Sequence, residues 1–360
     1  MDGGRDGDRG ALLSIVVPVL DEEETVGPFL DALAPAIERV RARQPFALGA
    51  EVVFVDDGSR DRTVEVVRAR RLAGGTIRLV KLSRNFGKDS ALAAGLAHAR
   101  GDMVVPMDVD LQDPPELLER MVEAWREGAF IVNAVRVDRS SDGWFKRRSA
   151  ATFYRVFNRL SAYPLHTDVG DFRLLDRRVV DTLVAMPERV RFTKGLFAWL
   201  GYAPVTIEYA RPPRSAGATK WKAWSLWNFA LDGITGSTTL PLRVWTYAGG
   251  ALALAAVGYA AIIVVRTLLY GVDTPGYASL MTVILVLSAI QLVALGILGE
   301  YIGRIAIEVR QRPLYLVEAV QEIDEDGVAR PAGLAEAARP ASLAGPVRPA
   351  SLAEPARGRP

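Results

Sequence analysis

The chain contains no cysteine and only two histidines among its 360 residues. Disulfide bridges and thiolate metal sites are therefore excluded, and a histidine-rich zinc site is excluded as well. The net charge of +2 is too small to suggest nucleic acid as a partner. Residues 1–10 are polar and lack the basic start and apolar stretch of a signal peptide, so we expect them to be disordered and cytoplasmic.

Two nucleotide-binding motifs are also missing. No Gly-x-Gly-x-x-Gly follows the first apolar run, and no Gly-Lys-Ser/Thr phosphate loop occurs anywhere in the chain. These motifs mark dinucleotide oxidoreductases and P-loop NTPases, so both classes lose support.

Two long apolar runs are present, at residues 244–265 and 279–302. Each is long enough to cross a bilayer as a helix, and the absence of charge within Val244–Val265 and Ser279–Gly299 argues against the alternative of buried core helices. Basic residues precede and follow the pair, Arg266 closes the first run, and the short linker Tyr270–Tyr277 carries one acid and no base, so the positive-inside rule places both chain ends in the cytoplasm. These flanking residues are Arg243, Arg304, Arg310 and Arg312.

The part before these runs, residues 11–210, alternates β-branched apolar runs with segments of helical spacing. The expected strands are Leu12–Leu20, Glu51–Val55, Ile77–Leu82, Met103–Met107 and Phe130–Val135. The expected helices are Glu22–Arg41, Thr63–Arg71, Lys88–Ala99 and Pro114–Glu127. This alternation predicts an α/β domain with a mostly parallel sheet, in which ligands bind beyond the carboxyl ends of the strands.

Acidic residues follow three of the expected strands, and we take this edge as the candidate active site. Asp21 follows the first strand, Asp56 and Asp57 the second, and Asp108 and Asp110 the fourth. In extended backbone, residues two apart point to one side, so Asp108, Asp110 and Gln112 can offer three oxygens to one hard cation. Mg²⁺ or Mn²⁺ accepts such ligands and would stabilise a diphosphate leaving group.

The motifs LSIVVPVLDEEE, VDDGSRD, LSRNFGK, MDVDLQDP and DVGDFRLL occur in this order from Leu13 to Leu175. With FTKGLFAWLGY, RPPRSAGATKW and GEYIGRIAIEVRQRPLYLV further on, the chain resembles the inverting glycosyltransferases that load polyprenyl phosphates, over about residues 12–320. The resemblance implies a GT-A-type nucleotide-sugar-binding domain. It also implies transfer of one sugar from a nucleotide-diphosphate sugar to undecaprenyl phosphate, with inversion.

The resemblance also implies roles for individual residues. For nucleotide, sugar and phosphate binding they are Pro18, Asp21, Glu23, Asp57, Asp108, Arg211, Arg214 and Lys220. Asp108, Asp110 and Gln112 are implied to hold the metal, and Asp110, Asp171 and Arg173 to act at the reaction centre. Lys88 lies beside Asn85-Phe86-Gly87, and we weigh diphosphate binding against an ordinary solvated loop residue.

The acceptor chemistry supports these roles independently. The second pKa of a phosphate monoester is near 6, so such an acceptor is largely ionised at neutral pH and hardly needs a general base. It needs a cation for positioning, which Arg supplies with a two-pronged hydrogen bond. We therefore assign Asp171 to orienting Arg173 or a sugar hydroxyl, with proton abstraction as the second choice.

The remaining segments predict how the domain meets the membrane. Residues 211–243 carry Trp221, Trp224 and Trp227 at helical spacing and suggest an amphipathic, interfacial segment; an ordinary core face is the alternative. Residues 303–325 are expected to be a cytoplasmic juxtamembrane segment. Residues 326–360 hold three Pro- and Ala-rich copies and are expected to be disordered.

Three functions are compatible with these features. The first is an inner-membrane transferase with two spans; UDP-glucose is the favoured donor, ahead of GDP-mannose and UDP-4-amino-arabinose derivatives, and the resemblance allows a homotetramer. The second is a processive polysaccharide synthase, disfavoured because Gln311-Arg312-Pro313 does not match Gln-x-x-Arg-Trp. The third is a non-catalytic membrane scaffold, disfavoured by intact Asp108 and Asp110.

Overall fold

A computed structural model gives the fold. It describes residues 10–136, 169–186, 188, 196–197, 199–209, 276–324, 326 and 329–331, and part of 249–270. The expectations for residues 1–9, for the amphipathic segment 211–243 and for the tail from 332 onward lie outside the described residues.

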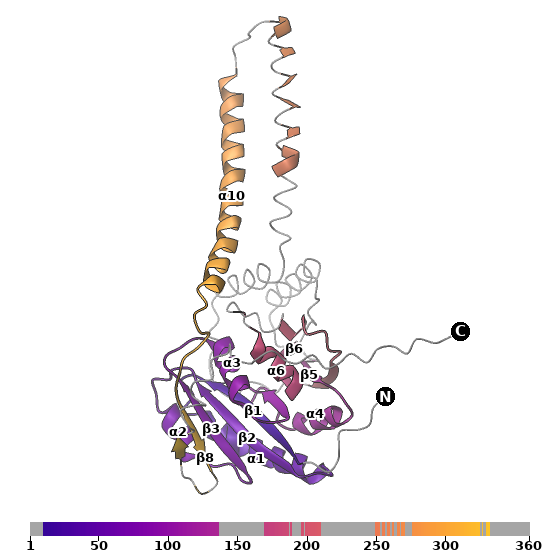
Figure 1. The fold of residues 1–360 in the computed structure, drawn as a ribbon, viewed down its shortest axis with the longest axis vertical. Coiled ribbons are helices and arrows are strands. Elements are labelled where there is room, and N and C mark those ends of the chain that lie inside the picture. The colour runs from indigo at the N-terminus through magenta and orange to yellow at the C-terminus, as the bar shows by residue number, and fades with distance from the viewer. Residues whose placement is uncertain are drawn as a thin grey trace, which may run out of the picture.

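A nine-stranded mixed sheet forms the centre of the described domain, in the order β7-β5-β6-β4-β1-β2-β3-β8-β9. Its strands are β1 (Ala11–Val19), β2 (Leu48–Asp56), β3 (Gly75–Leu82), β4 (Met103–Pro106), β5 (Ile131–Arg136), β6 (Val169–Asp176), β7 (Val205–Tyr209), β8 (Val317–Ile323) and β9 (Ala329–Pro331). Strands β4, β1, β2 and β3 run parallel, whereas β6 and β8 pair antiparallel with β4 and β3. The carboxyl ends of four neighbouring strands therefore meet at one edge (Figure 1).

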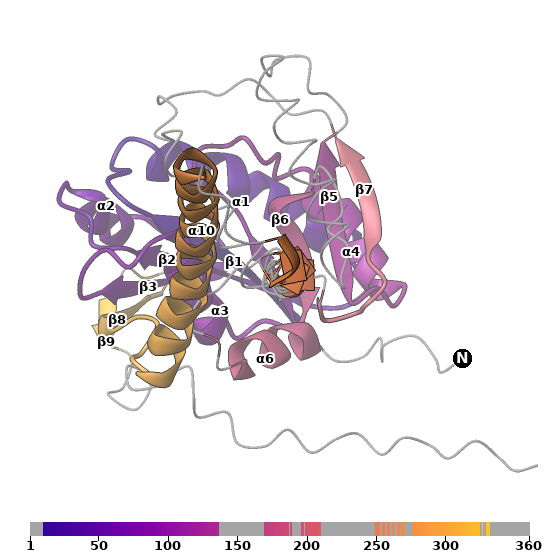
Figure 2. The ribbon, with the colours of Figure 1, turned by 90° about the horizontal axis from the view of Figure 1, so that it is seen from above.

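Helices cover both faces of the sheet (Figure 2). The helices of one face are α1 (Val26–Arg43), α2 (Thr63–Ala69) and α4 (Leu117–Arg126), and those of the other are α3 (Lys88–His98) and α6 (Arg177–Ala185). Strand side chains alternate between these cores: Ile15 and Val17 pack on the α1 side, and Val16 on the α3 side. Helix α3 packs closely because residue 95 is Gly; an added Cβ there would lie 2.2 Å from the Val16 side chain.

The second apolar run forms helix α10 (Tyr277–Val309), which extends beyond the expected span at both ends. Within the described residues, one stretch qualifies as a membrane span by length and composition, Val286–Val309. The described positions between 249 and 270 are all helical, and they continue past the expected end of the first run at Val265. Both segments extend from the same side of the sheet domain (Figure 1).

The sheet does not end before the hairpin, and this differs from the expected organisation. Strand β8 lies in the segment expected to be juxtamembrane, and it pairs with β3 from Ile77↔Ile323 to Leu82↔Val317. Strand β9 pairs with β8, although residues 326–360 were expected to be disordered. The physical reason is that β3 would otherwise leave a row of backbone N–H and C=O groups without partners at the edge of the sheet.

Buried charges bind β8 to the rest of the domain. Arg78 of β3 is 1% exposed, and its guanidinium lies 3.2 Å from Glu322 of β8 and 3.8 Å from Glu51 of β2. Arg100 reaches the same Glu322 carboxylate at 3.1 Å. Strand β8 is thus an integral part of the folded domain.

Candidate active site

The strand-end acids gather at the edge of the sheet that faces the hairpin. Asp21, Asp57 and Asp108 follow the parallel strands β1, β2 and β4, while Asp171 lies near the start of the antiparallel strand β6. An antiparallel strand begins where its parallel neighbour ends, so Asp171 arrives at the same edge. Sequence periodicity gave no sign of β6, and only the resemblance pointed to Asp171.

Lys88 joins two of these acids. Its ammonium Nζ donates to both oxygens of Asp108, at 2.8 and 2.9 Å, and to Oδ2 of Asp171 at 3.0 Å. Burial acts against the charge, but Asp171 and Asp108 outweigh it and raise the pKa of Lys88. Lys88 is therefore a firmly charged cation at the first turn of α3, between the ends of β4 and β6.

The segment after β4 makes a tight turn. Asp110 Oδ1 accepts a hydrogen bond from the Gln112 backbone N–H at 3.2 Å, and Leu111 has a positive φ of 56°. That angle is unusual for a leucine and fixes the direction of the flanking side chains. Asp108, Asp110 and Gln112, the predicted metal ligands, all belong to this segment.

Asp113 is a residue of this segment that sequence reasoning did not single out. It is 9% exposed and accepts a hydrogen bond from the Tyr209 hydroxyl at 3.2 Å. Burial, and then the charges of Asp108 and Asp110, raise the pKa of Asp113 to about 7. Asp108, Asp110 and Asp113 thus place three carboxyl groups in one short segment. Asp113 differs from the other two by its burial, which the sequence does not reveal.

The donor chemistry suits a hard divalent cation, although the described residues contain no group of three or more His, Cys, Asp or Glu side chains arranged to hold one. Asp108 and Asp110 supply carboxylate oxygens and Gln112 an amide oxygen, which Mg²⁺ and Mn²⁺ prefer. The negative charge that raises the pKa of Asp113 would be relieved by such an ion. The predicted ligand set therefore fits the ion, with Lys88 competing for Asp108.

Arg173 lies beside Asp171 on β6 but is buried, with 3% of its surface exposed. Its guanidinium packs 3.8 Å from the ring centre of Phe197, and Nη2 donates to the carbonyl of Gly170 at 2.7 Å. Burial lowers the pKa of Arg173 to about 10 while Asp171 opposes the shift, so the side chain is cationic at neutral pH. Its Nε has no hydrogen-bond partner among the described residues.

The nucleotide-binding residues expected at the first two strands are placed as follows. Both oxygens of Asp57 accept backbone N–H groups, from Phe86 at 2.7 Å and Gly87 at 2.9 Å, and burial raises the pKa of Asp57 despite these bonds. Asp21, with a positive φ of 53°, accepts the N–H of Arg60.

Two further residues expected to bind the nucleotide, Glu23 and Pro18, lie near the end of β1. Glu23 binds the backbone and side chain of Arg62, at 3.1 and 3.2 Å. Pro18 lies near the end of β1, opposite Val55 of β2. Acidic residues beyond β1 therefore contact basic residues beyond β2: Asp21 contacts Arg60, and Glu23 contacts Arg62.

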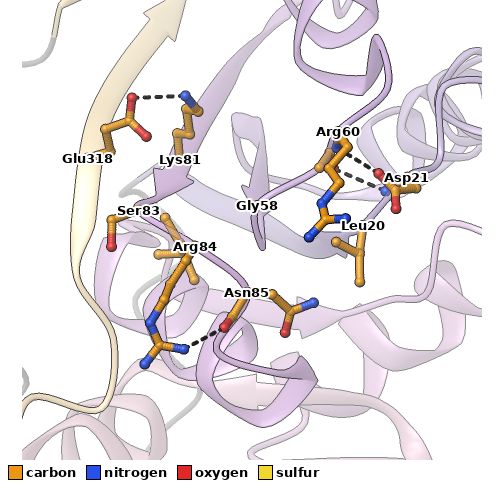
Figure 3. A pocket seen from close by; sticks show the side chains of 11 residues that line it. Leu20, Asp21, Gly58, Arg60, Lys81, Ser83, Arg84, Asn85 and Glu318 are labelled. Carbon is orange, nitrogen blue, oxygen red and sulfur yellow. Dashed lines mark hydrogen bonds and ion pairs between the residues drawn. The ribbon is translucent and has the colours of Figure 1, made fainter.

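A pocket of about 420 Å³ opens at the ends of β1, β2 and β3 (Figure 3). It is lined by Leu20, Asp21, Gly58, Ser59, Arg60, Lys81, Leu82, Ser83, Arg84, Asn85 and Glu318. Glu318 comes from β8, beyond the hairpin, and bonds Lys81 at 2.9 Å. Sequence reasoning missed Lys81 and Glu318 because nothing in the sequence brings residue 318 beside β3.

The other predicted substrate-binding residues, Arg211, Arg214 and Lys220, lie outside the described residues, as does the tryptophan stripe at 221–227. Trp199, which the structure does describe, is 54% exposed.

Comparisons with known proteins agree on one family. The model "Glycosyl transferase family 2" matches residues 14–184, and "GtrB C-terminal hairpin" matches residues 240–305. An uncharacterized glycosyltransferase of Synechocystis is 46% identical over 85% of this chain and 94% of its own length. A prophage-derived bactoprenol glucosyl transferase of Shigella flexneri is 44% identical over 85% and 97%.

The solved structures that resemble this chain include a mannosyltransferase of Pyrobaculum calidifontis in complex with GDP-mannose and Mn²⁺, which is 20% identical over 83% of this chain and 86% of its own, with a TM-score of 0.40.

Proposed function

This chain belongs to glycosyl transferase family 2, and from that premise we propose that it transfers one glucosyl residue from UDP-glucose to bactoprenol (undecaprenyl) phosphate. The relatives named bactoprenol glucosyl transferase share 43–44% identity with it over almost their whole length, hairpin included. The agreement therefore covers both parts that the family models match, residues 14–184 and 240–305.

The observation that carries the proposal is the position of the hairpin relative to the acidic edge. Only Arg310–Leu316 separate α10 from β8, and Leu316 accepts the backbone N–H of Ser83 just after β3. The membrane helix therefore ends at the edge of the sheet that holds Asp108, Lys88 and Asp171. A lipid phosphate in the headgroup layer and a water-soluble donor can meet at this edge.

The exposed surface of α10 supports the same arrangement. Only 6% of the apolar stretch within Val286–Val309 is buried inside the protein. Its exposed large apolar side chains include Leu292, Leu295, Leu298, Ile302 and Ile305. Such a surface is stable in a hydrocarbon environment. We propose two spans, at 244–265 and within 277–309, with the catalytic domain and both chain ends on the cytoplasmic side.

The transfer is a single displacement. An oxygen of the acceptor phosphate forms a bond to the anomeric carbon, and the bond from that carbon to the diphosphate oxygen breaks with UDP taking the electron pair. Because the acceptor oxygen is already ionised near neutral pH, no proton has to move in this step. The configuration at the anomeric carbon inverts.

The chain's own residues position two phosphate groups for this step. Lys88 places one ammonium between the ends of β4 and β6, where it can contact the donor diphosphate. Arg173 is held by Gly170 and Phe197, so its fork keeps a fixed direction beside Asp171. Asp171 orients these cations electrostatically, and it acts as a base only in second place.

Asp108, Asp110 and Gln112 would hold a Mg²⁺ or Mn²⁺ ion, which when bound neutralises charge on the leaving diphosphate. The pocket at the ends of β1 to β3 receives the nucleoside; of the acids expected to bind the nucleotide, Asp21 lines this pocket, whereas Glu23 and Asp57 are not among its lining residues. Arg211, Arg214 and Lys220 are proposed to contact phosphates as well.

The test is transfer of labelled glucose from UDP-glucose to undecaprenyl phosphate by the full-length protein in membranes, with Mn²⁺. Glucosylated lipid is expected from the wild type and none from Asp108→Ala. The same assay with GDP-mannose provides the comparison. Mannose transfer without glucose transfer would overturn the donor assignment. If neither sugar were transferred to undecaprenyl phosphate, the proposed function would be overturned.

A further inference from the structure

We infer that Lys81 and Glu318, an ion pair formed across strands β3 and β8, read the base of the nucleotide donor. The two side chains lie at the rim of the 420 Å³ pocket, with Lys81 Nζ 2.9 Å from Glu318 Oε1 (Figure 3). The inference rests on the proposed function for one point only, that the donor is a nucleoside diphosphate sugar whose diphosphate lies near Asp108.

The order of the strands determines which part of the nucleotide reaches this pair. Asp108 follows β4, and the sheet continues from β4 through β1 and β2 to β3 and β8. With neighbouring strands about 4.8 Å apart, the end of β3 lies about 14 Å from that of β4, comparable with an extended nucleoside diphosphate. A nucleotide with its diphosphate at Asp108 therefore points its ribose along the pocket and its base toward β3 and β8.

The pair offers a donor beside an acceptor. Lys81 uses one N–H for Glu318 Oε1, and no described residue bonds Glu318 Oε2. The remaining pattern is an ammonium N–H next to a carboxylate oxygen. Uracil presents the complementary pattern, with O4 accepting and N3–H donating. Cytosine presents the opposite pattern at these positions, with an amino donor and N3 as acceptor.

Asp57, which the resemblance implies to bind the nucleotide, is less available to the base than Glu318. Each of its oxygens already accepts a backbone N–H, it is 4% exposed, and it is not among the residues lining the pocket. The Glu318 side chain is 50% exposed and lines the pocket directly. Glu318 can therefore meet a ligand without disturbing backbone contacts.

The exposure of the pair also makes it testable without unfolding the protein. Exposed ion pairs contribute little to stability. Glu318→Ala and Glu318→Gln should thus have the same melting temperature as the wild type. Gln321→Ala is the matched control, because Gln321 lies on the same strand and bonds Arg68 at 2.8 Å instead of lining the pocket.

The experiment measures dissociation constants of the full-length protein in detergent for UDP, 3-methyluridine diphosphate and CDP. Methylation of N3 removes only the donor that Glu318 is expected to accept. We expect the wild type and Gln321→Ala to bind UDP about 10-fold or more tighter than the other two ligands, as for a hydrogen bond to a charged group. Glu318→Ala should lose most UDP affinity and bring the UDP to 3-methyl-UDP ratio close to one.

An unchanged ratio in Glu318→Ala would overturn the inference, and a ratio that collapses only in Asp57→Asn would assign base reading to Asp57. Both outcomes differ from failure of the proposed function, which the glucose-transfer assay on the wild type decides separately. GDP is not used as the discriminating ligand, because guanine presents O6 and N1–H in the same order as uracil presents O4 and N3–H.

Discussion

Replacing Lys88 by Met tests whether the cation between Asp108 and Asp171 serves catalysis or only stability. Its ion pairs involve side chains that are 35–47% exposed. Exposed pairs contribute at most about 1 kcal/mol each, so the variant should lose about 1–2 kcal/mol and melt no more than about 8 °C lower. Loss of a donor to developing negative charge costs far more in rate, typically about 10²–10³-fold in kcat.

The assay is glucose transfer to undecaprenyl phosphate over a series of Mn²⁺ concentrations, with thermal unfolding measured in parallel. Lys88→Arg is the control that keeps the charge. Because Lys88 occupies Asp108, its removal should also lower the Mn²⁺ concentration needed for half-maximal rate. An activity in Lys88→Met that equals or exceeds the wild type at saturating Mn²⁺ would refute the reasoning, since Lys88 would then only compete with the metal.

The pH dependence of the stability that Lys88 contributes follows from the direction in which its pKa is shifted. Asp171 and Asp108 raise the pKa of Lys88, so its stabilising contribution is complete below the unfolded pKa of about 10.4 and disappears only as pH rises through the higher folded pKa. The difference in melting temperature between the wild type and Lys88→Met should therefore stay constant between about pH 6 and 9. A difference that shrinks within this range would contradict the assignment of the charge.

Three further predictions concern other parts of the structure. Asp108→Ala should abolish transfer while Asp171→Asn keeps measurable turnover, because an ionised acceptor needs little base catalysis; equal loss in both would contradict the assigned roles. Glu322→Ala should destabilise the domain by about 1–3 kcal/mol in chemical unfolding, because it leaves the buried Arg78 without its nearest carboxylate. Gly95→Val should lower the melting temperature strongly, since even a Cβ would lie 2.2 Å from Val16, and Gly296→Ala, at an exposed helical glycine of α10 with open space around it, is the comparison for glycine replacement.

The core of the fold could be predicted because its signals are local. The first five expected strands agree with β1 to β5 to within three residues at every end, since β-branched runs buried on both sides have few alternative structures. The later strands gave no comparable signal. Strand β8 has an alternating, partly charged pattern. Its partner strand β3 precedes the hairpin in the sequence, so that Val317 pairs with the distant Leu82.

The candidate site was predictable in part for the same reason. Strand-end acids such as Asp108 are visible in the sequence because they follow recognisable strands. The bridge from Lys88 to Asp171, the burial of Asp113 and the place of Glu318 are not visible, because each depends on contacts between distant segments. Charge and burial of single residues follow from the three-dimensional arrangement and not from spacing.

The position of β8 after the hairpin also sets the order of events during synthesis. The ribosome makes β1 to β7 first, then both apolar segments, and only afterwards the strand that covers the edge of β3. Domains generally begin to fold from the N-terminus while synthesis continues, so the nascent sheet waits with one open edge until the apolar helices have emerged. The membrane segment is therefore available for insertion before the nucleotide pocket receives Glu318. A chain whose synthesis stops before β8 would lack the strand that supplies Glu318, so every molecule with a complete pocket also carries both apolar segments.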